Sequence, residues 1–119
     1  MNRRRAAHWR GVLAEYYCVL FLLIKGYSIL ALRYKHPRGE VDIIAHKGNA
    51  LIFVEVKARV KPEDALLSIT DQKKVRTMQG ALGYIANQSR FQHHDLRFDV
   101  MVVTSRLRII HLANAWSVA

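Results

Sequence analysis

The sequence predicts one layered α/β domain, in which helices cover both faces of a mixed sheet of about five strands. Three observations predict this fold. The 119 residues are 51% hydrophobic, which is enough apolar material for one buried core. Helical segments and segments rich in Val and Ile follow one another in the order α-β-β-β-α-β-β. No internal repeat, low-complexity stretch or linker divides the chain, so residues 1–119 are expected to form a single domain.

The first element is a helix expected over residues 9–25. No Gly or Pro interrupts it after Gly11, and a lysine followed by Gly26 gives a basic last turn and a stop. Beyond Glu15 the helix is apolar nearly all round, so we expect it to be well covered. The uninterrupted apolar run, residues 16–24, is too short for a membrane span, which needs roughly 20 residues. No small-residue cleavage site follows, so we expect a core helix rather than a targeting segment.

The strands and the second helix follow from local signals. Residues 27–34 are β-like, and Pro37-Arg38-Gly39 forms a turn. Residues 40–46 and 51–58 are rich in Val and Ile around Gly48-Asn49, which is a hairpin signal. The remaining expectations are a mobile loop over 59–68, a helix capped by Thr70 or Asp71 and ending near Asn87, a polar loop over 88–95, strands over 98–104 and 107–112 around Ser105-Arg106, and a short helical tail from Ala113.

The net charge indicates the class of binding partner, and the cysteine count indicates the cellular compartment. Lys and Arg number 19 and Asp and Glu number 9, so 19 − 9 gives a net charge of +10. Such a surplus favours a polyanion, nucleic acid first and an anionic membrane second, although a solvated basic surface with no specific partner remains open. One cysteine excludes an intrachain disulfide and is typical of a reducing compartment, so we expect a cytoplasmic location.

The hairpin predicts a candidate site. If Gly48-Asn49 is a two-residue turn, paired positions sum to 97, so Asp42 lies across from Glu55 and Glu40 lies across from Lys57. Because side chains alternate with period two, these four residues project from one face. Ile44 and Phe53 extend that face, and the other face is apolar throughout, with Val41, Ile43, Ala45, Ile52, Val54 and Val56.

Opposed carboxylates are a costly way to build a strand pair. Asp42 and Glu55 should repel and raise one pKa, and a divalent cation would remove the repulsion. Hard oxygen ligands suit Mg²⁺ or Mn²⁺, with Asp42 and Glu55 as the ligands. Lys57 could orient the attacking water or stabilise charge on a phosphate. The alternative reading is a solvated strand face with a plain Glu40–Lys57 ion pair.

Further basic residues suit a nucleic-acid contact. Lys73, Lys74 and Arg76 lie near the start of the second helix, where positive charge opposes the helix dipole, so either an anion or plain solvation accounts for them. The candidate contacts are Arg38, Arg59, Lys73, Lys74 and Arg76. Asp99, in an apolar strand, is interpreted as structural and paired with a basic residue.

Several motifs together resemble one family. They are Gly39-Glu40-Val41-Asp42-Ile43-Ile44-Ala45, Phe53-Val54-Glu55-Val56-Lys57-Ala58-Arg59, Arg97-Phe98-Asp99-Val100, Gly11 with Glu15, Gly26-Tyr27, Lys73 with Tyr84, and His111-Leu112-Ala113-Asn114-Ala115. The pattern resembles the YraN family (uncharacterised protein family 0102) within the PD-(D/E)xK nuclease superfamily, over nearly the whole chain.

The resemblance implies a restriction-endonuclease-like three-layer α/β/α fold, similar to Holliday-junction resolvases, in a bacterial protein. It implies Glu15 as a further acidic member of the site, Asp42 and Glu55 as metal ligands and Lys57 as the catalytic lysine. It also suggests site-flanking roles for Glu40 and Lys73.

Three functions are therefore weighed. The first is a Mg²⁺- or Mn²⁺-dependent endonuclease that hydrolyses DNA phosphodiester bonds, at branched or flapped structures. The second is a nucleic-acid-binding module with a nuclease fold and no cleavage. The third, a membrane-surface protein, ranks last because the first helix is better explained as core, so no membrane partner is expected. A homodimer is compatible with resolvase-like chemistry.

Overall fold

The structure is a computed structural model that describes residues 2–59, 61–104 and 106–116, apart from the side chains of residues 7–9 and 62. Within these residues five strands form one sheet in the order β1-β2-β3-β4-β5, and only the β3–β4 pair among them is parallel. The mixed five-stranded sheet is therefore confirmed. The elements are α1 (Arg3–Ile24), β1 (Ser28–His36), β2 (Gly39–Lys47), β3 (Ala50–Ala58), α2 (Pro62–Leu67), α3 (Asp71–Ala86), the 3₁₀ turn η1 (Ser89–Phe91), β4 (Asp95–Val103) and β5 (Ile109–Trp116).

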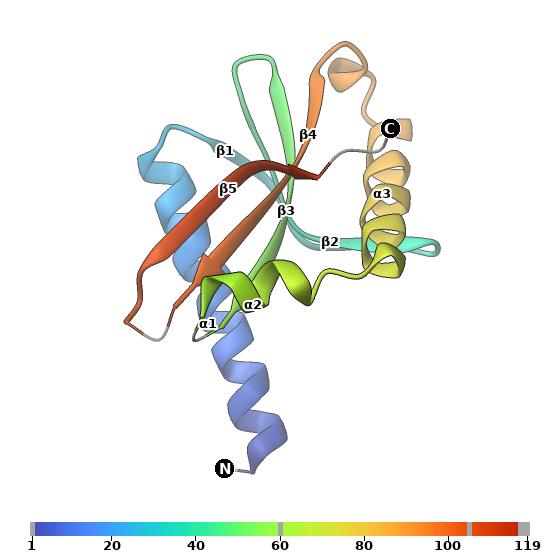
Figure 1. Cartoon of the computed structure of the whole chain (residues 1–119). Helices are drawn as coiled ribbons and strands as arrows, with labels where there is room; N and C mark the ends of the chain where they lie inside the picture. The colour runs from blue at the N-terminus through green and yellow to red at the C-terminus, as the bar shows by residue number, and fades with distance from the viewer. Residues whose placement is uncertain (1, 60, 105, 117–119) are drawn as a thin grey trace.

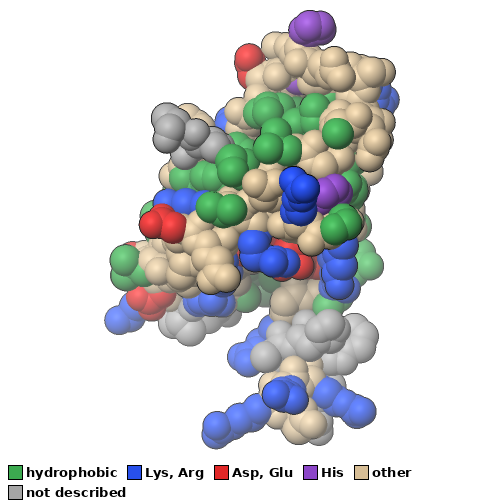
Figure 2. Space-filling view, turned by 90° about the vertical axis from the view of Figure 1, so that its right-hand side faces the viewer, with side chains coloured by type: hydrophobic (Ala, Val, Ile, Leu, Met, Phe, Trp, Pro, Cys, Tyr) green, Lys and Arg blue, Asp and Glu red, His purple; other side chains and the backbone are tan. Residues whose placement is uncertain are grey.

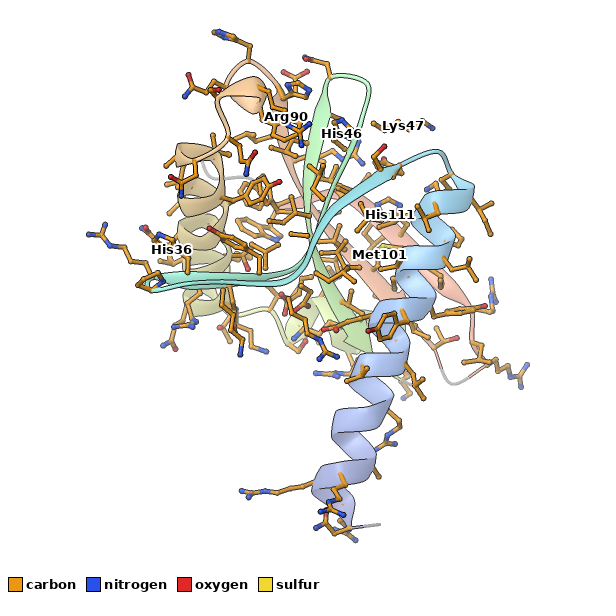
Figure 3. The ribbon with its side chains drawn as sticks, turned by 180° about the vertical axis from the view of Figure 1, so that it is seen from behind. His36, His46, Lys47, Arg90, Met101 and His111 are labelled. Atoms are coloured by element: carbon orange, nitrogen blue, oxygen red, sulfur yellow. The ribbon has the colours of Figure 1, made fainter. Side chains whose placement is uncertain are left out.

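Helices lie on opposite faces of the sheet, α1 on one and α3 on the other (Figure 1). Each face has its own apolar core. On the α1 side, Cys18 and Leu22 pack with Ile43, Val54 and Met101, and Figure 3 shows Met101 beside α1. The cluster of buried residues that includes α3 consists of Val41, Ile44, Leu51, Phe53, Ala81, Tyr84, Phe91 and Phe98, and Ala65, Val100 and Val102 form a further cluster. The layered α/β architecture therefore follows from strands that are apolar on both faces.

The hairpin register is the expected one. β2 pairs with β3 from Lys47 opposite Ala50 to Ile43 opposite Val54, and every pair sums to 97. The pairing stops there, because the β1–β2 hairpin bends away from β3 and runs to α3, where His36 lies (Figure 3). The bend coincides with the left-handed backbone of Arg33, at φ 49°.

Because of this bend, two expectations from the sequence are wrong. Glu40 does not lie across from Lys57; its partner is Lys35 on β1. Val41 does not share a face with Ile43, since it packs in the α3-side core instead. Simple alternation fails because the strand turns between these two positions.

Gly39 lets the bent hairpin approach α3. A Cβ on Gly39 would run into the carbonyl oxygen of Arg76 and would lie 2.7 Å from the backbone nitrogen of Gly80. Gly39→Ala is expected to lower the free energy of unfolding by about 1–3 kcal/mol, because the two backbones must separate. Urea denaturation measures it. The matched control is Gly11→Ala on α1, where a Cβ meets nothing within 4 Å; this change should stabilise by about 0.5–1 kcal/mol. Equal effects at both sites would contradict the packing described.

The first helix differs from expectation at its start and in its cover. It begins at Arg3, not residue 9, because the side chain of Asn2 accepts a hydrogen bond from the backbone N–H of Arg5 at 2.8 Å and caps it. It was expected to be well covered, yet several large apolar side chains on it are exposed. Its N-terminal turns project beyond the sheet (Figure 1).

Three segments between and after the core strands also differ. The expected mobile loop over 59–68 contains α2, whose Ala65 is fully buried against Val100 and Val102; residue 60 of that loop lies outside the described residues. The expected polar loop over 88–95 contains buried Phe91. The expected helical tail from Ala113 is wrong as far as residue 116, because β5 continues to Trp116. Thr70 caps α3 as expected, and Ser105 lies outside the described residues.

Candidate active site

Asp42 lies at the corner where β2 leaves β3. Its Oδ2 accepts a hydrogen bond from the backbone N–H of Val56 at 2.8 Å. Once β2 bends away, no backbone carbonyl of β2 is paired opposite Val56, and the carboxylate takes that place. The contact satisfies a partly buried backbone donor and holds the Asp42 side chain against β3.

Glu55 and Lys57 follow two and four residues beyond Phe53 on β3, and they pair with each other. Lys57 Nζ lies 3.0 Å from Glu55 Oε1, and the Lys57 side chain is only 9% exposed. On α3, Lys73 lies close to the same lysine. The hydrogen-bonding contact with the Lys57 side chain lowers the pKa of Lys73, and partial burial and then repulsion between the two ammonium groups lower it further.

Burial and like charge act on Asp42 together. Desolvation, then repulsion from Glu55, raises the pKa of Asp42 from 3.8 to about 7, although the Val56 N–H and the Lys57 ammonium oppose the shift. The charge of Glu15 adds to the rise. The sequence predicted this repulsion between Asp42 and Glu55. However, the β2–β3 pairing ends at Ile43 and Val54, so the two acidic residues are not directly paired across the strands.

The raised pKa predicts how stability depends on pH. Between about pH 4 and 7 the folded state keeps a proton on Asp42 that the unfolded state has lost, so the free energy of unfolding falls as pH rises through this window. Asp42→Asn keeps an oxygen for the Val56 N–H and removes the charge. It should flatten that slope and stabilise the protein by about 1–3 kcal/mol at pH 8. Urea denaturation at pH 5 and pH 8 measures both effects.

The control for this prediction is Asp95→Asn, at an exposed position at the start of β4. It should leave the pH dependence of wild type in place. An Asp42→Asn protein that is less stable than wild type at pH 8 would contradict the electrostatic account.

Glu15 reaches the same corner from α1. Its Oε2 forms an ion pair with Arg33 Nε at 2.6 Å, a partner that the sequence did not suggest. Glu15, Glu40 and Asp42 line one open hollow of about 180 Å³. Arg33, Tyr34, Lys35 and Val41 complete its lining. Glu40 therefore lies near Asp42 and Glu15 rather than beside Lys57.

The basic candidates come from three places in the fold. Arg38 is at the tip of the β1–β2 hairpin, Arg59 follows β3, and Lys73, Lys74 and Arg76 occupy the first half of α3. All are exposed except Lys74, which is half-buried. Figure 2, viewed from the α3 side, shows Lys and Arg side chains around a small acidic patch, below an apolar area.

An apolar pocket of about 410 Å³ is separate from the acidic corner. Its lining comes from α3, β4 and β5, and Trp116 stacks on Phe98 with ring centroids 4.2 Å apart. The lining residues are Met78, Ala81, Leu82, Leu96, Phe98, Asn114 and Trp116. Sequence reasoning missed this pocket, because its walls come from three segments far apart in the chain.

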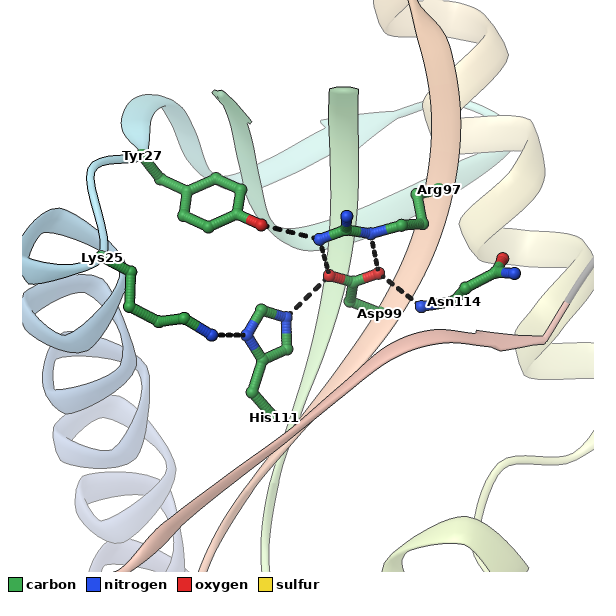
Figure 4. A network of polar contacts seen from close by, with 6 residues as sticks. All are labelled: Lys25, Tyr27, Arg97, Asp99, His111 and Asn114. Carbon is green, nitrogen blue, oxygen red and sulfur yellow. Dashed lines mark hydrogen bonds and ion pairs between the residues drawn. The ribbon is translucent and has the colours of Figure 1, made fainter. Parts of the chain in front are cut away.

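Asp99 is fully buried at the centre of a polar network (Figure 4). Arg97 donates to both of its oxygens at 2.8 Å, His111 Nε2 lies 2.7 Å away, and the backbone N–H of Asn114 donates at 2.9 Å. Burial would raise the pKa of Asp99, but the hydrogen bonds from His111, Arg97 and Asn114 hold it at about 2. The expected pairing of Asp99 with a basic residue is confirmed, and its structural role stays a prediction.

The network extends to the end of α1. Arg97 Nη2 also donates to the Tyr27 hydroxyl at 2.7 Å, and Lys25 Nζ lies 2.9 Å from His111 Nδ1. A lysine ammonium can only donate, so Nδ1 of His111 accepts and Nε2 carries the proton that faces Asp99. The motifs that carry the family resemblance contain Tyr27 and His111, but nothing in the sequence places them together.

The corner offers two close carboxylates for a metal. Among the residues that the structure describes, no group of three His, Cys, Asp or Glu side chains is arranged to hold an ion. Mg²⁺ needs fewer, because it commonly takes one or two carboxylates and completes its shell with water and substrate phosphate. The mutual repulsion that raises the pKa of Asp42 is what a bound cation would relieve, so Asp42 and Glu55 fit such an ion.

Comparison with known proteins gives one consistent family. A family model described as "Uncharacterised protein family UPF0102" matches residues 14–103. A UPF0102 protein of Bradyrhizobium diazoefficiens is 39% identical over 95% of this chain and 85% of its own length. UPF0102 proteins of Rhizobium meliloti and Methylorubrum populi are 40% and 39% identical, over 97% and 98% of this chain and 94% and 93% of their own lengths. The names of these relatives state no activity or substrate.

Proposed function

The chain belongs to uncharacterised protein family UPF0102, the YraN family, and from that premise we propose that it is a metal-dependent endonuclease that hydrolyses DNA phosphodiester bonds. Branched or flapped DNA is the proposed substrate, and the cytoplasm is the proposed location. The observation that carries the proposal is the meeting of Asp42, Glu55 and Lys57 at one corner of the sheet, where Asp42 has a raised pKa.

Each side chain has a separate task in this proposal. Asp42 and Glu55 would hold Mg²⁺ or Mn²⁺, which when bound supplies Lewis acidity and lowers the pKa of a water molecule. Lys57, almost buried, places its ammonium where it can stabilise charge that develops on the phosphate. Glu15 keeps Arg33 at the edge of the corner. Arg38, Arg59, Lys73, Lys74 and Arg76 would neutralise backbone phosphates on either side of the scissile bond.

The alternative is a module that binds nucleic acid without cutting it. The Glu55–Lys57 ion pair favours this alternative, because a carboxylate already neutralised by lysine has less need of a cation. The net charge of +10 supports either function equally.

A cleavage assay distinguishes the two functions. Labelled four-way junction, flap, duplex and single-stranded DNA are incubated with the protein in Mn²⁺, in Mg²⁺ and in EDTA. The endonuclease proposal expects cleavage of a branched or flapped DNA in either metal and none in EDTA. Salt-sensitive binding that survives EDTA, without cleavage in any metal, would favour the binding module.

Metal binding can be measured without any cleavage. Mn²⁺ at about 100 times its Kd should stabilise the wild-type fold by about 2.7 kcal/mol, because only the folded state brings Asp42 and Glu55 together. The melting temperature should rise accordingly in wild type and stay constant in Asp42→Asn. The control is Asp95→Asn, which should respond to Mn²⁺ as wild type does. If Mn²⁺ raised the melting temperature of Asp42→Asn equally, the ion would bind elsewhere.

A further inference from the structure

Helix α1 has two apolar faces, of which the sheet covers only one. Ala14, Cys18 and Leu22 are buried on the core face, at a spacing of four residues. Large apolar side chains on the rest of the helix are between 39% and 78% exposed. We name these residues the outer stripe: Leu13, Tyr16, Tyr17, Leu20, Leu23 and Ile24. No element of the described chain covers them, and a continuous exposed apolar patch of this kind marks an interaction surface.

The outer stripe has the spacing of a helix-pairing seam. Leu13, Tyr16, Leu20 and Leu23 follow one another at intervals of three, four and three residues. This is the repeat of positions a and d in a coiled coil, which presents one row of side chains to a partner helix. A helix that only needed to pack on its own sheet would not require this second row.

We propose that the outer stripe pairs with the outer stripe of a second copy of this chain, with the two α1 helices antiparallel. The area fits a dimer, since six side chains of these sizes and exposures present on the order of 700 Å² per subunit, against roughly 800 Å² per partner in a standard stable interface. The same surface serves both subunits, as a two-fold contact requires. The proposal does not rest on the nuclease activity.

The charges on α1 select the antiparallel orientation. Arg3, Arg4, Arg5 and Arg10 are exposed on its first turns. A parallel pair would place these arginines beside the same arginines of the other subunit. In the antiparallel pair, Leu13 lies opposite Leu23 of the partner subunit and Tyr16 lies opposite Leu20 of the partner subunit. Arg10 then lies near the carboxyl end of the other helix, where its charge complements the helix dipole.

A lipid surface is the competing occupant. By length and composition alone α1 could cross a membrane, whereas its uninterrupted apolar run was expected to be too short to do so. Mostly buried core helices and N-terminal signal sequences pass the same test, but only 20% of this stretch of α1 is buried. Its arginines lie at the N-terminal end, where an anionic membrane would attract them. The heptad-like spacing and the match in area favour a second copy, and the experiment includes vesicles so that the two occupants give different results.

The first test measures mass in solution. The wild-type chain of 119 residues at about 50 μM should sediment with roughly twice the chain mass of 13.7 kDa. Leu20→Glu should raise the dimer dissociation constant at least about 10-fold, because it places a charge in the centre of the contact between the two outer stripes. The matched control is Leu82→Glu on α3, since Leu82 is 51% exposed and Leu20 is 55% exposed; it should remain dimeric. A monomeric wild type, or equal dissociation by both variants, would overturn the proposal.

The second test determines whether the two α1 helices pair in the antiparallel or the parallel orientation. Leu13→Cys and Leu23→Cys proteins are oxidised separately and as a mixture, while native Cys18 is fully buried and does not compete. The antiparallel pair expects a disulfide in the mixture and little in either protein alone. Self-crosslinking of each protein alone would contradict the orientation. Binding of monomeric wild type to vesicles of phosphatidylglycerol and phosphatidylcholine, abolished by Leu20→Glu, would assign the stripe to a membrane and overturn the dimer.

Discussion

Lys57→Ala is expected to lower the rate of DNA cleavage by at least about 100-fold while leaving DNA affinity within about three-fold of wild type. The reason is position: the Lys57 ammonium is nearly buried, 3.0 Å from Glu55, so it contributes little to the exposed surface that holds the phosphate backbone. It acts on charge that develops in the transition state, and its loss should therefore appear in the rate at saturating DNA. Single-turnover cleavage in Mn²⁺ and fluorescence anisotropy in EDTA measure the two quantities.

The matched control is Lys74→Ala, on α3. Lys74 is a candidate phosphate contact, so its removal should weaken DNA binding and reduce the slope of log affinity against log salt concentration by about 1. The cleavage rate at saturating DNA should change little. Because Lys57→Ala leaves Glu55 unpaired, Lys57→Gln serves as a second variant that fills the same space. If both Lys57 variants cleaved DNA at the wild-type rate, Lys57 would have no role in catalysis. If both variants lost the far-UV circular dichroism of the folded protein, the defect would come from misfolding.

Asp99→Ala is expected to lower the free energy of unfolding by about 3–5 kcal/mol, the cost of breaking a buried ion pair by removing one partner. The change leaves the Arg97 guanidinium, the proton on His111 Nε2 and the backbone N–H of Asn114 without their acceptor. Urea denaturation at pH 7 measures the loss. The control is Asp95→Ala on the same strand, whose exposed carboxylate has only a 3.4 Å contact with Asn49; it should change stability by less than about 0.5 kcal/mol.

The depressed pKa of Asp99 adds a dependence on acid. Its folded pKa of about 2 lies below the usual 3.8, so its stabilisation is complete above about pH 4 and is lost as pH falls toward 2. Wild type should therefore lose stability on acidification more steeply than Asp99→Asn, which has no such group. A loss below about 1 kcal/mol for Asp99→Ala at pH 7 would contradict a network that ties α1 to β4 and β5.

Local signals in the sequence were sufficient to predict the register of the β2–β3 hairpin. Gly48 adopts the positive φ that a tight turn requires, at 57°, and the two-residue turn determines a register in which all pairs sum to 97. The order of the five strands and the two longer helices, the Thr70 cap of α3 and the apolar strands follow from the same kind of short-range pattern, whereas α2 was not predicted. These features depend on neighbours within a few residues, which is why periodicity and turn chemistry predict them.

The sequence by itself determined the family, the hairpin register and a small set of candidate acidic and basic residues. Only the tertiary structure decided how they meet. The bend at Arg33 separates Glu40 from Lys57, gives Asp42 the backbone N–H of Val56 and brings Gly39 against α3. Likewise, the polarity of each α1 residue is visible in the sequence, but which face the sheet covers is not. Both outcomes depend on contacts between segments far apart in the chain, and no local pattern contains them.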